Sequence, residues 1–431
     1  MLNKEKSEET ESMFERDIRP ARRAAKTIIC SLLLVVCGAS AAHAAADVEP
    51  IAAVVDRDVQ VAAAQYRVLL AKVAGKPGFP RSVAHGDVRM VGPGDWTAGF
   101  FPGSLWYLFE ATGDATWKTA AMRYTALTAP AKFDKTQHDL GFMLGAGYGN
   151  GLRLVDDPAT RTAYRDALLA GATTLMTRFN PKVGSIQSWD LWPNTTWAFP
   201  VIIDNMMNLE LLMWAARAAD EPRYREVAIA HADTALKNHF RPDGSSFHLV
   251  DYDPKTGAVR ARMTVQGYAN GSAWARGQAW GLYGYTMMYR ETHKDDYLQQ
   301  AHRIARFYMN HPRLPADRIP FWDFDDPAIP AAPRDSSAAA IAASALLELA
   351  SFSDRDTAAR YRDFAEQTLR SLSSGAYLAQ PGDNGGFLLK HATGHKPAGT
   401  EIDGPLNYAD YYFLEALLRM KAARTGIGSF H

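Results

Sequence analysis

Hydrophobic and polar residues follow a degenerate repeat along most of the chain. A mostly apolar segment ends in a short acidic turn, and an amphipathic segment that begins with an aromatic residue follows it. Clear copies run through the ranges 105–117, 209–224 and 281–297, and looser copies run through 156–164 and 353–361. The marker aromatics lie 47 to 73 residues apart and are Trp117, Tyr164, Tyr224, Tyr297 and Tyr361. This spacing predicts one helical hairpin per repeat, with loops of variable length.

The two segments of a repeat differ in how their apolar residues are placed. In the range 224–238, the residues Tyr224, Val227, Ala228 and Ala235 fall on one stripe of a helix, and charged residues face away. The range 336–349 consists mostly of Ala, Ile and Leu, so we expect it to be buried on every side. The pattern therefore predicts amphipathic outer helices paired with apolar inner helices.

The number of helical segments is about twelve, which makes roughly six hairpins. A closed ring of six hairpins, an all-α (α/α)6 barrel, hides every inner helix and is the favoured fold. A curved, open solenoid of the same hairpins is the alternative. No low-complexity linker or change in composition divides residues 47–425, so the range 45–431 is predicted to be a single domain.

One stretch departs from the helical pattern. Residues 245–252 and 258–265 have the composition of strands, and the turn between them, 253–257, contains Asp, Pro and Gly. This arrangement is typical of a β-hairpin. In an all-helical ring such an insertion is expected at one end, where loops meet ligands.

The amino-terminal region is predicted to be an export signal. Basic residues between Arg19 and Lys26 precede an apolar run at 27–38, and the small-residue motif Ala42-His43-Ala44 follows. The apolar run is too short to span a membrane as a stable helix. We expect residues 1–44 to be removed and the mature protein to be periplasmic.

Composition and charge exclude several classes of function. The two cysteines, Cys30 and Cys37, lie in the predicted signal, so the mature chain would contain no disulfide, cysteine nucleophile or thiolate metal site. Lys plus Arg and Asp plus Glu both number 47, and a formal net charge of zero argues against nucleic acid and anionic membranes as partners. The 10 Trp and 18 Tyr suit flat ligands such as sugar rings as well as a core.

Two aspartates are the candidate catalytic residues. Asp139 and Asp204 each stand at the start of an apolar inner segment, where an unpaired charge is costly. Aspartate is also a favoured helix N-cap, and capping alone would explain both positions. If the inner helices open into a central cavity, however, the two carboxylates face the same space.

A second cluster contains Gln266, Arg276 and Trp280. The last two are four residues apart on a predicted helix and share a face. An arginine beside an indole suits a ligand that has a carboxylate and a flat face, although a core tryptophan under an arginine stem is the structural alternative. His248, in the predicted hairpin, is either a hydrogen-bond donor to a ligand or a structural histidine. Further indoles in loop-like stretches are Trp96, Trp189, Trp192 and Trp197.

Several long motifs resemble the unsaturated glucuronyl hydrolases of glycoside hydrolase family 88. They are Trp96–Gly103, His138-Asp139, Asp204–Asn208, Trp274–Trp280, Pro320–Asp325 with Arg334–Ser337, and Glu401–Asp403 with Tyr408–Leu414. The resemblance runs over nearly all of the mature chain. It implies an (α/α)6 barrel that acts on oligosaccharides made by polysaccharide lyases, which carry a 4,5-unsaturated uronic acid at the non-reducing end.

The resemblance also implies roles for single residues. Asp204 matches the acid/base of the family, and Asp139 matches an assisting aspartate. The residues assigned to substrate binding are Trp96, His138, Trp189, His248, Thr264, Gln266, Arg276 and Trp280. Val265 stands where many relatives carry a histidine, which leaves the discrimination between sulfated and unsulfated substrates open.

The expected reaction is hydration of the C4=C5 enol ether of the unsaturated sugar, with no metal or organic cofactor. The expected partner is an unsaturated oligosaccharide of about disaccharide size, and the expected state is a monomer or weak homodimer. The alternatives are a related barrel hydrolase acting on unsaturated rhamnogalacturonan or ulvan fragments, a non-catalytic periplasmic sugar-binding protein and a polysaccharide lyase.

Overall fold

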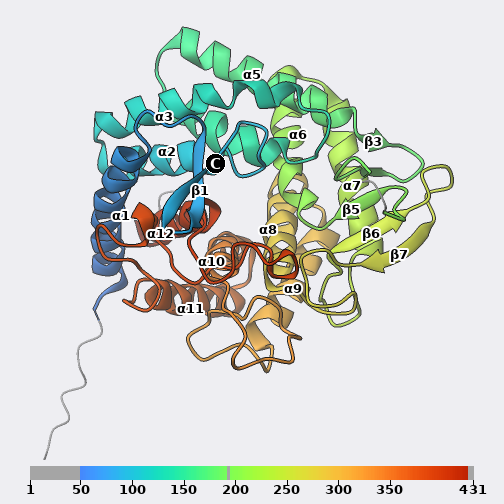
Figure 1. The fold of residues 1–431 in the computed structure, drawn as a ribbon. Helices are drawn as coiled ribbons and strands as arrows, with labels where there is room; N and C mark the ends of the chain where they lie inside the picture. Colours follow the sequence, from blue (N-terminus) through green and yellow to red (C-terminus); the bar gives the residue numbers. More distant parts are fainter. Residues whose placement is uncertain (1–48, 192–194, 426–431) are drawn as a thin grey trace, which may run out of the picture. The chain divides into compact units, whose positions relative to one another are not determined.

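The computed structural model describes residues 49–191 and 195–425, so the predicted signal segment and Trp192 lie outside the described residues. Outer and inner helices alternate along the chain (Figure 1). The outer helices are α1 (Ile51–Val73), α3 (Ala115–Leu127), α5 (Pro158–Met176), α7 (Pro222–Asn238), α9 (Asp295–Asn310) and α11 (Arg355–Leu372). The inner elements are α2 (Phe100–Thr112), the π-helix η2 (Gly141–Gly149) continued by α4 (Asn150–Leu154), α6 (Asn205–Ala219), α8 (Ala275–Thr292), α10 (Ser336–Leu349) and α12 (Asn407–Thr425).

The inner elements form a closed ring. Each packs against the next in the order α2, η2, α6, α8, α10 and α12, and α12 packs back against α2. An open solenoid would keep the first and last inner helices apart, so that alternative is wrong. The fold is the predicted (α/α)6 barrel.

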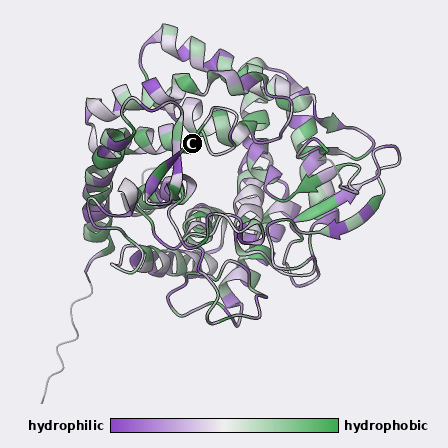
Figure 2. Ribbon diagram, in the orientation of Figure 1, coloured by the Kyte–Doolittle hydropathy of each residue, from purple (hydrophilic) through white to green (hydrophobic). Residues whose placement is uncertain are grey.

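Burial separates the two layers as the hydrophobic pattern predicts. Every residue of α10 is buried. On α7 the buried residues include Val227, Ala228 and Ala235, whereas Tyr224 is only half-buried. Figure 2 shows the alternation of hydrophobic and hydrophilic residues along the outer helix α1. Each outer helix therefore covers the apolar ring with one face and meets water with the other.

Most acidic turns of the sequence repeat provide a side-chain helix N-cap, whereas the turn before α9 does not. The carboxylates of Asp114, Asp157 and Asp354 accept hydrogen bonds from backbone N–H groups in the first turns of α3, α5 and α11. Such a cap stabilises a helix by about 1 kcal/mol relative to alanine. At three of the turns a residue with positive φ ends the preceding inner helix: Gly113 at 71° after α2, Asp220 at 53° after α6 and His293 at 53° after α8.

Long and short connections lie at opposite ends of the barrel. Each inner helix passes to the next outer helix through a few residues, such as 113–114 and 220–221. The return connections, such as 177–204, 239–274 and 373–406, are much longer. They include the hairpin β1 (Phe79–Ala84) and β2 (Asp87–Val91), the pair β3 (Phe179–Asn180) and β4 (Ser185–Ile186), and the 3-10 turns η1 (Ala129–Phe133), η4 (Asn384–Gly386) and η5 (Lys396–Ala398). One further 3-10 turn, η3 (Ala350–Phe352), continues α10 at the other end.

The predicted β-hairpin is present within narrower bounds. Strands β6 (Leu249–Tyr252) and β7 (Val259–Met263) are antiparallel, and β5 (Pro200–Ile202) adds a third strand that the sequence analysis did not predict. Val201 and Val250 belong to a small separate core under this sheet. Because β5 ends just before Asp204, the sheet fixes the backbone that leads to this aspartate: the N–H of Ile203 donates to the carbonyl of His248 at 2.9 Å.

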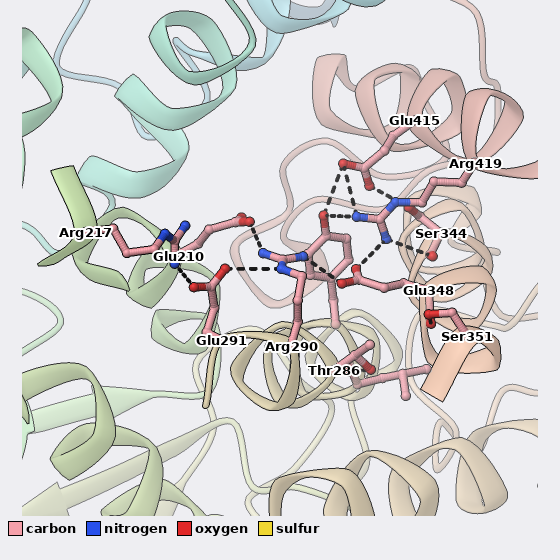
Figure 3. A network of polar contacts seen from close by, with 12 residues as sticks. Glu210, Arg217, Thr286, Arg290, Glu291, Ser344, Glu348, Ser351, Glu415 and Arg419 are labelled. Carbon is pink, nitrogen blue, oxygen red and sulfur yellow. Dashed lines mark hydrogen bonds and ion pairs between the residues drawn. The ribbon is translucent and has the colours of Figure 1, made fainter. Parts of the chain in front are cut away.

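Side chains in the middle and in the C-terminal turns of the inner helices form a polar network (Figure 3). Glu415 on α12 accepts hydrogen bonds from the hydroxyls of Tyr107 on α2, at 2.8 Å, and Tyr283 on α8, at 3.1 Å. Arg419 on α12 pairs with Glu348 on α10 at 2.9 Å. These contacts join four inner helices at the end opposite the long loops.

Arg290 on α8 extends the network toward α6. Its guanidinium pairs with Glu348 at 2.6 Å, with Glu291 at 3.2 Å and with Glu210 of α6. Cations at this end offset the partial negative charge of the helix C-termini. A cavity of about 360 Å³ borders the network, and neither predicted catalytic aspartate lines it.

Replacing Glu348 with alanine is expected to lower the free energy of unfolding by about 3 kcal/mol, because two largely buried guanidinium groups would each lose a partner. Unfolding in guanidinium chloride, followed by tryptophan fluorescence, measures this loss. The matched control is Glu366→Ala, which removes a half-exposed pair with Arg370 on α11 and is expected to cost about 0.5 kcal/mol. Equal losses in the two variants would contradict a stabilising role for the buried network.

Candidate active site

The ring brings the predicted site residues to the end where the inner helices begin. Asp139 lies two residues before η2, Asp204 lies directly before α6, and Arg276 is in the first turn of α8. His248, at the edge of β6, reaches the same place, since its Nε2 atom lies 3.9 Å from Oδ2 of Asp204. Residues far apart in the sequence therefore become neighbours because all inner helices start at this end.

Helix capping does not explain the two aspartates. Asp204 precedes α6, but its side chain makes no capping hydrogen bond, and its backbone is already helical at φ −57° and ψ −28°. Leu140 is already helical, so Asp139 directly precedes the helix that continues into η2, but the hydrogen bond that its carboxylate accepts comes from Asn208 and not from a backbone N–H of the first turn. The capping hypothesis is therefore wrong for both carboxylates, in contrast to the acidic turns at the other end.

Both carboxylates are buried, at 7% exposure each, but their surroundings differ. Oδ1 of Asp139 lies 3.4 Å from Nε2 of His138 and accepts a hydrogen bond from Nδ2 of Asn208, also at 3.4 Å. Oδ2 of Asp204 makes no hydrogen bond with any residue in the described part of the chain. Asp139 is thus held by protein groups, whereas one oxygen of Asp204 is left for something else to contact.

Burial makes the pair hold protons near neutral pH. It raises the pKa of Asp139 to about 8, and the nearby charge of Asp204 adds to this effect. It raises the pKa of Asp204 to about 7, although the positive charge of Arg276 opposes the change. Because the two groups titrate as a coupled pair, the pair carries one proton between these values.

His248 presents an N–H toward Asp204. The backbone N–H of Val265 donates to its Nδ1 atom at 2.9 Å, so Nδ1 is the acceptor and Nε2 carries the hydrogen of the neutral ring. Burial lowers the pKa of His248, and it lowers that of His138 to about 3. Both rings are therefore neutral at physiological pH, and neither can serve as the acid.

Thr264 and Gln266 lie directly after β7 and are half-buried. The backbone N–H of Gln266 donates to Nδ1 of His248 at 3.3 Å, and the Thr264 hydroxyl lies 3.4 Å from the same atom. The hydroxyl also accepts a hydrogen bond from the N–H of Gly267 at 2.7 Å. These two residues thus orient the His248 ring through local contacts.

Indole rings pack against the two histidines and against aromatic residues of the inner helices. Trp189 packs edge-on against both His138 and His248, with ring centroids 6.4 Å apart in each case. Trp96 is half-buried and packs on Tyr408 at 4.9 Å. Trp280 is fully buried and packs on Phe142 at 5.1 Å, so it belongs to the aromatic core beneath the site.

Arg276 differs from the prediction in its neighbours. Its guanidinium lies over the indole of Trp274, at 4.4 Å from the ring centroid, and not over that of Trp280. It is fully buried, pairs with Asp335 at 3.2 Å and donates to the carbonyl of Gly394 at 2.6 Å. The group that the sequence suggested as a ligand for a carboxylate is thus held by protein partners, while its charge still acts on Asp204.

Asn208 is a site residue to which the sequence analysis assigned no role. It is fully buried one turn after Asp204, and its Oδ1 atom accepts a hydrogen bond from the N–H of Phe142 at 3.0 Å. The two segments meet at Gly141, where a Cβ atom would lie 2.7 Å from Cα of Asn208. The i, i+4 spacing of Asp204 and Asn208 was the available signal, but the partner of Asn208 is set by the packing of two distant helices.

Glycoside hydrolases use a pair of carboxyl groups as acid and base. This closed α/α barrel contains such a pair, buried and protonated near neutral pH. The family model described as Glycosyl Hydrolase Family 88 matches residues 80–426. The chain belongs to this family and is an enzyme.

Similar proteins carry consistent names. The chain is 47% identical to the unsaturated glucuronyl hydrolase of Formosa agariphila over 357 residues. This aligned region covers 82% of this chain and 88% of that protein. It is 33% identical to the unsaturated chondroitin disaccharide hydrolase of Streptococcus pyogenes, over 75% of this chain and 81% of that protein. A solved unsaturated glucuronyl hydrolase described as specific for heparin matches with a TM-score of 0.82 and 46% identity, over 88% of this chain and 100% of the solved chain.

Within residues 49–191 and 195–425, the structure contains no helix with the length and apolar character needed to cross a membrane.

The raised pKa values predict that the two carboxyl groups lower the free energy of unfolding at alkaline pH. The folded state keeps a proton that the unfolded chain releases near the ordinary pKa of 3.8, so the free energy of unfolding falls as the pH rises from about 4 toward about 8. Asp139→Asn is expected to raise the unfolding free energy at pH 8.5 by roughly 2 kcal/mol and to leave it nearly unchanged at acidic pH.

Chemical unfolding at the two pH values measures this difference. Asp157→Asn is the matched control, and it is expected to lower the unfolding free energy at pH 8.5. The reason is that hydrogen bonds from Thr160 lower the pKa of Asp157, an exposed helix cap. A loss of stability in Asp139→Asn at pH 8.5 would contradict the assignment of a costly buried charge.

Proposed function

We propose that this family 88 hydrolase removes the 4,5-unsaturated uronic acid from the non-reducing end of oligosaccharides produced by polysaccharide lyases. The observation that carries the proposal is the buried pair of Asp139 and Asp204, which keeps one proton between about pH 7 and 8. An acid that remains protonated near neutral pH is what protonation of an enol ether requires.

Asp204 is the group that delivers the proton, although Asp139 has the higher pKa and so holds the last proton of the pair more tightly. Its Oδ2 atom makes no hydrogen bond with any described residue, whereas Asp139 is engaged by Asn208. Protonation at C4 of the unsaturated sugar places positive charge at C5, where the ring oxygen stabilises it. Water then adds to C5, and Asp204 takes the proton that this water releases. The hemiketal opens and the aglycone leaves, so the carboxyl group ends in its starting state.

The remaining residues bind and orient the sugar in this proposal. His248 directs its Nε2–H toward Asp204 and can donate to a sugar oxygen held there. Trp96 and Trp189, both half-buried, offer apolar ring surface. Arg276 and the N-terminal ends of the inner helices favour an anionic uronate at this end of the barrel.

The substrate class proposed is a disaccharide of glycosaminoglycan type. The names of the similar proteins, which include heparin and chondroitin, support this class. Heparin-derived disaccharides are the first to test, because the solved relative at 46% identity is described as specific for heparin.

We also propose that the enzyme is exported to the periplasm. The basic, apolar and small-residue segments before Ala44 support export with removal of residues 1–44. Amino-terminal sequencing of the secreted mature protein tests this part. A protein that retains residue 1 and stays in the cytoplasm would contradict it.

The central test follows the ultraviolet absorbance of the C4=C5 bond while purified enzyme meets unsaturated disaccharides from heparin, chondroitin, hyaluronan and ulvan. Absorbance is expected to fall with glycosaminoglycan disaccharides, and Asp204→Asn is expected to slow the fall by about 10³-fold or more because the proton donor is gone. Asp157→Asn, which alters an exposed helix cap at the other end, is the control that keeps activity.

Other outcomes separate the alternatives. A rise in absorbance with intact polysaccharide would identify a lyase. No change with any disaccharide would contradict hydrolysis and favour a binding protein, and a fall with ulvan fragments alone would replace the substrate class.

A further inference from the structure

Asn208 connects the two aspartates through a single amide group. It lies on α6, four residues after Asp204, and its Nδ2 atom donates to Oδ1 of Asp139 at 3.4 Å. It is fully buried, so a substrate bound at Asp204 does not reach it. Any influence of Asn208 on the reaction must therefore act through Asp139.

The orientation of this amide is determined by its second contact. The backbone N–H of Phe142, in the first turn of η2, points at Oδ1 of Asn208 at 3.0 Å. A backbone N–H can only donate, so the oxygen of the amide must face it and the NH₂ group must face Asp139. Asp139 consequently meets an obligatory donor, which favours its carboxylate form over its carboxylic acid form.

The two acids differ in this respect. Oδ2 of Asp204 has no hydrogen-bond donor among the described residues. The other titratable and charged groups near the pair are His138 beside Asp139, His248 on β6, Asp95 before α2, Arg178 after α5 and Arg276 on α8. Both histidines are neutral, and Asp95 raises the pKa of Asp139 while Arg178 lowers it. Asn208 is thus the neutral hydrogen-bond donor that distinguishes one acid from the other.

We propose that Asn208 is a positioning residue that lowers the proton affinity of Asp139, so that the proton shared by the pair becomes available to Asp204. The inference rests on the roles proposed above for Asp139 and Asp204. It explains why, of two carboxyl groups that are equally buried, Asp204 acts as the proton donor and Asp139 as its partner.

Asn208→Asp separates this role from a structural one. A carboxylate can still accept the N–H of Phe142, so the contact between α6 and η2 is kept. Toward Asp139, however, it presents a like charge in place of a donor. When the new carboxyl group is protonated at low pH, its hydroxyl restores the donor.

The measurement is kcat and KM between pH 5 and 9 for the unsubstituted enzyme, Asn208→Asp and Asn208→Ala in the absorbance assay. The ratio of the Asn208→Asp kcat to the unsubstituted kcat is expected to approach one at low pH and to fall about tenfold per pH unit while the new carboxyl group ionises. KM is expected to change little, because Asn208 does not touch the substrate.

Asn208→Ala is the second variant, in case the aspartate variant does not fold. It has no donor at any pH, so its kcat is expected to be reduced throughout, without recovery at low pH. Its alkaline limb, where the pair loses its last proton, is expected to move up by about one pH unit because the pKa of Asp139 rises without the donor.

The matched control is Asn150→Asp, which also buries a carboxyl group in an inner helix. Asn150 on α4 donates to the carbonyl of Ala146 at 3.0 Å and to the hydroxyl of Tyr411 at 3.2 Å, beside the far cavity. The ratio of the Asn150→Asp kcat to the unsubstituted kcat is expected to be independent of pH.

Two results would overturn the inference. One is an Asn208→Asp ratio that does not vary with pH, and the other is an Asn208→Ala alkaline limb that does not move. Either result in an otherwise active enzyme contradicts the role of Asn208 alone. An unsubstituted enzyme that consumes no unsaturated disaccharide contradicts the proposed function as well.

Discussion

Closure of the inner ring is the constraint on which the rest of the structure depends. Each inner helix must contact both of its neighbours, and glycines stand where the backbones approach most closely. A Cβ atom on Gly103 would lie 2.5 Å from the ring of Tyr411, and one on Gly284 would lie 2.5 Å from Cβ of Met206. Because each hairpin enters the ring in the same direction, closure also gathers the long loops and the inner N-termini at one end.

The candidate site follows from this gathering and from the exclusion of water. Carboxyl groups at the start of an inner helix are surrounded by the next helices of the ring, so they are buried without being caps. Their protonation near neutral pH is a direct result of that burial. The same burial costs stability once the groups ionise, which is a common feature of functional sites.

Much of the fold could be predicted because it depends on local pattern. The buried stripe of α7 and the uniformly apolar α10 are visible as periodicity, and the turn residues mark the β-hairpin. Contacts between distant segments could not be predicted in this way. The bond from Asn208 to Asp139, the addition of β5 to the hairpin and the packing of Arg276 on Trp274 each depend on how two helices or loops are aligned. The sequence motifs therefore located the site, while the partner of each side chain needed the structure.

The opposite directions of inner and outer helices have an electrostatic consequence at a distance. In the described part of the chain the inner helices run one way and the outer helices the other, so their dipoles largely cancel when viewed from several helix lengths away. The chain also has a formal net charge of zero. An anionic saccharide is therefore attracted only at short range, once it is close to the inner N-termini. Ionic strength is then a determinant of how long the saccharide stays bound more than of how often it arrives.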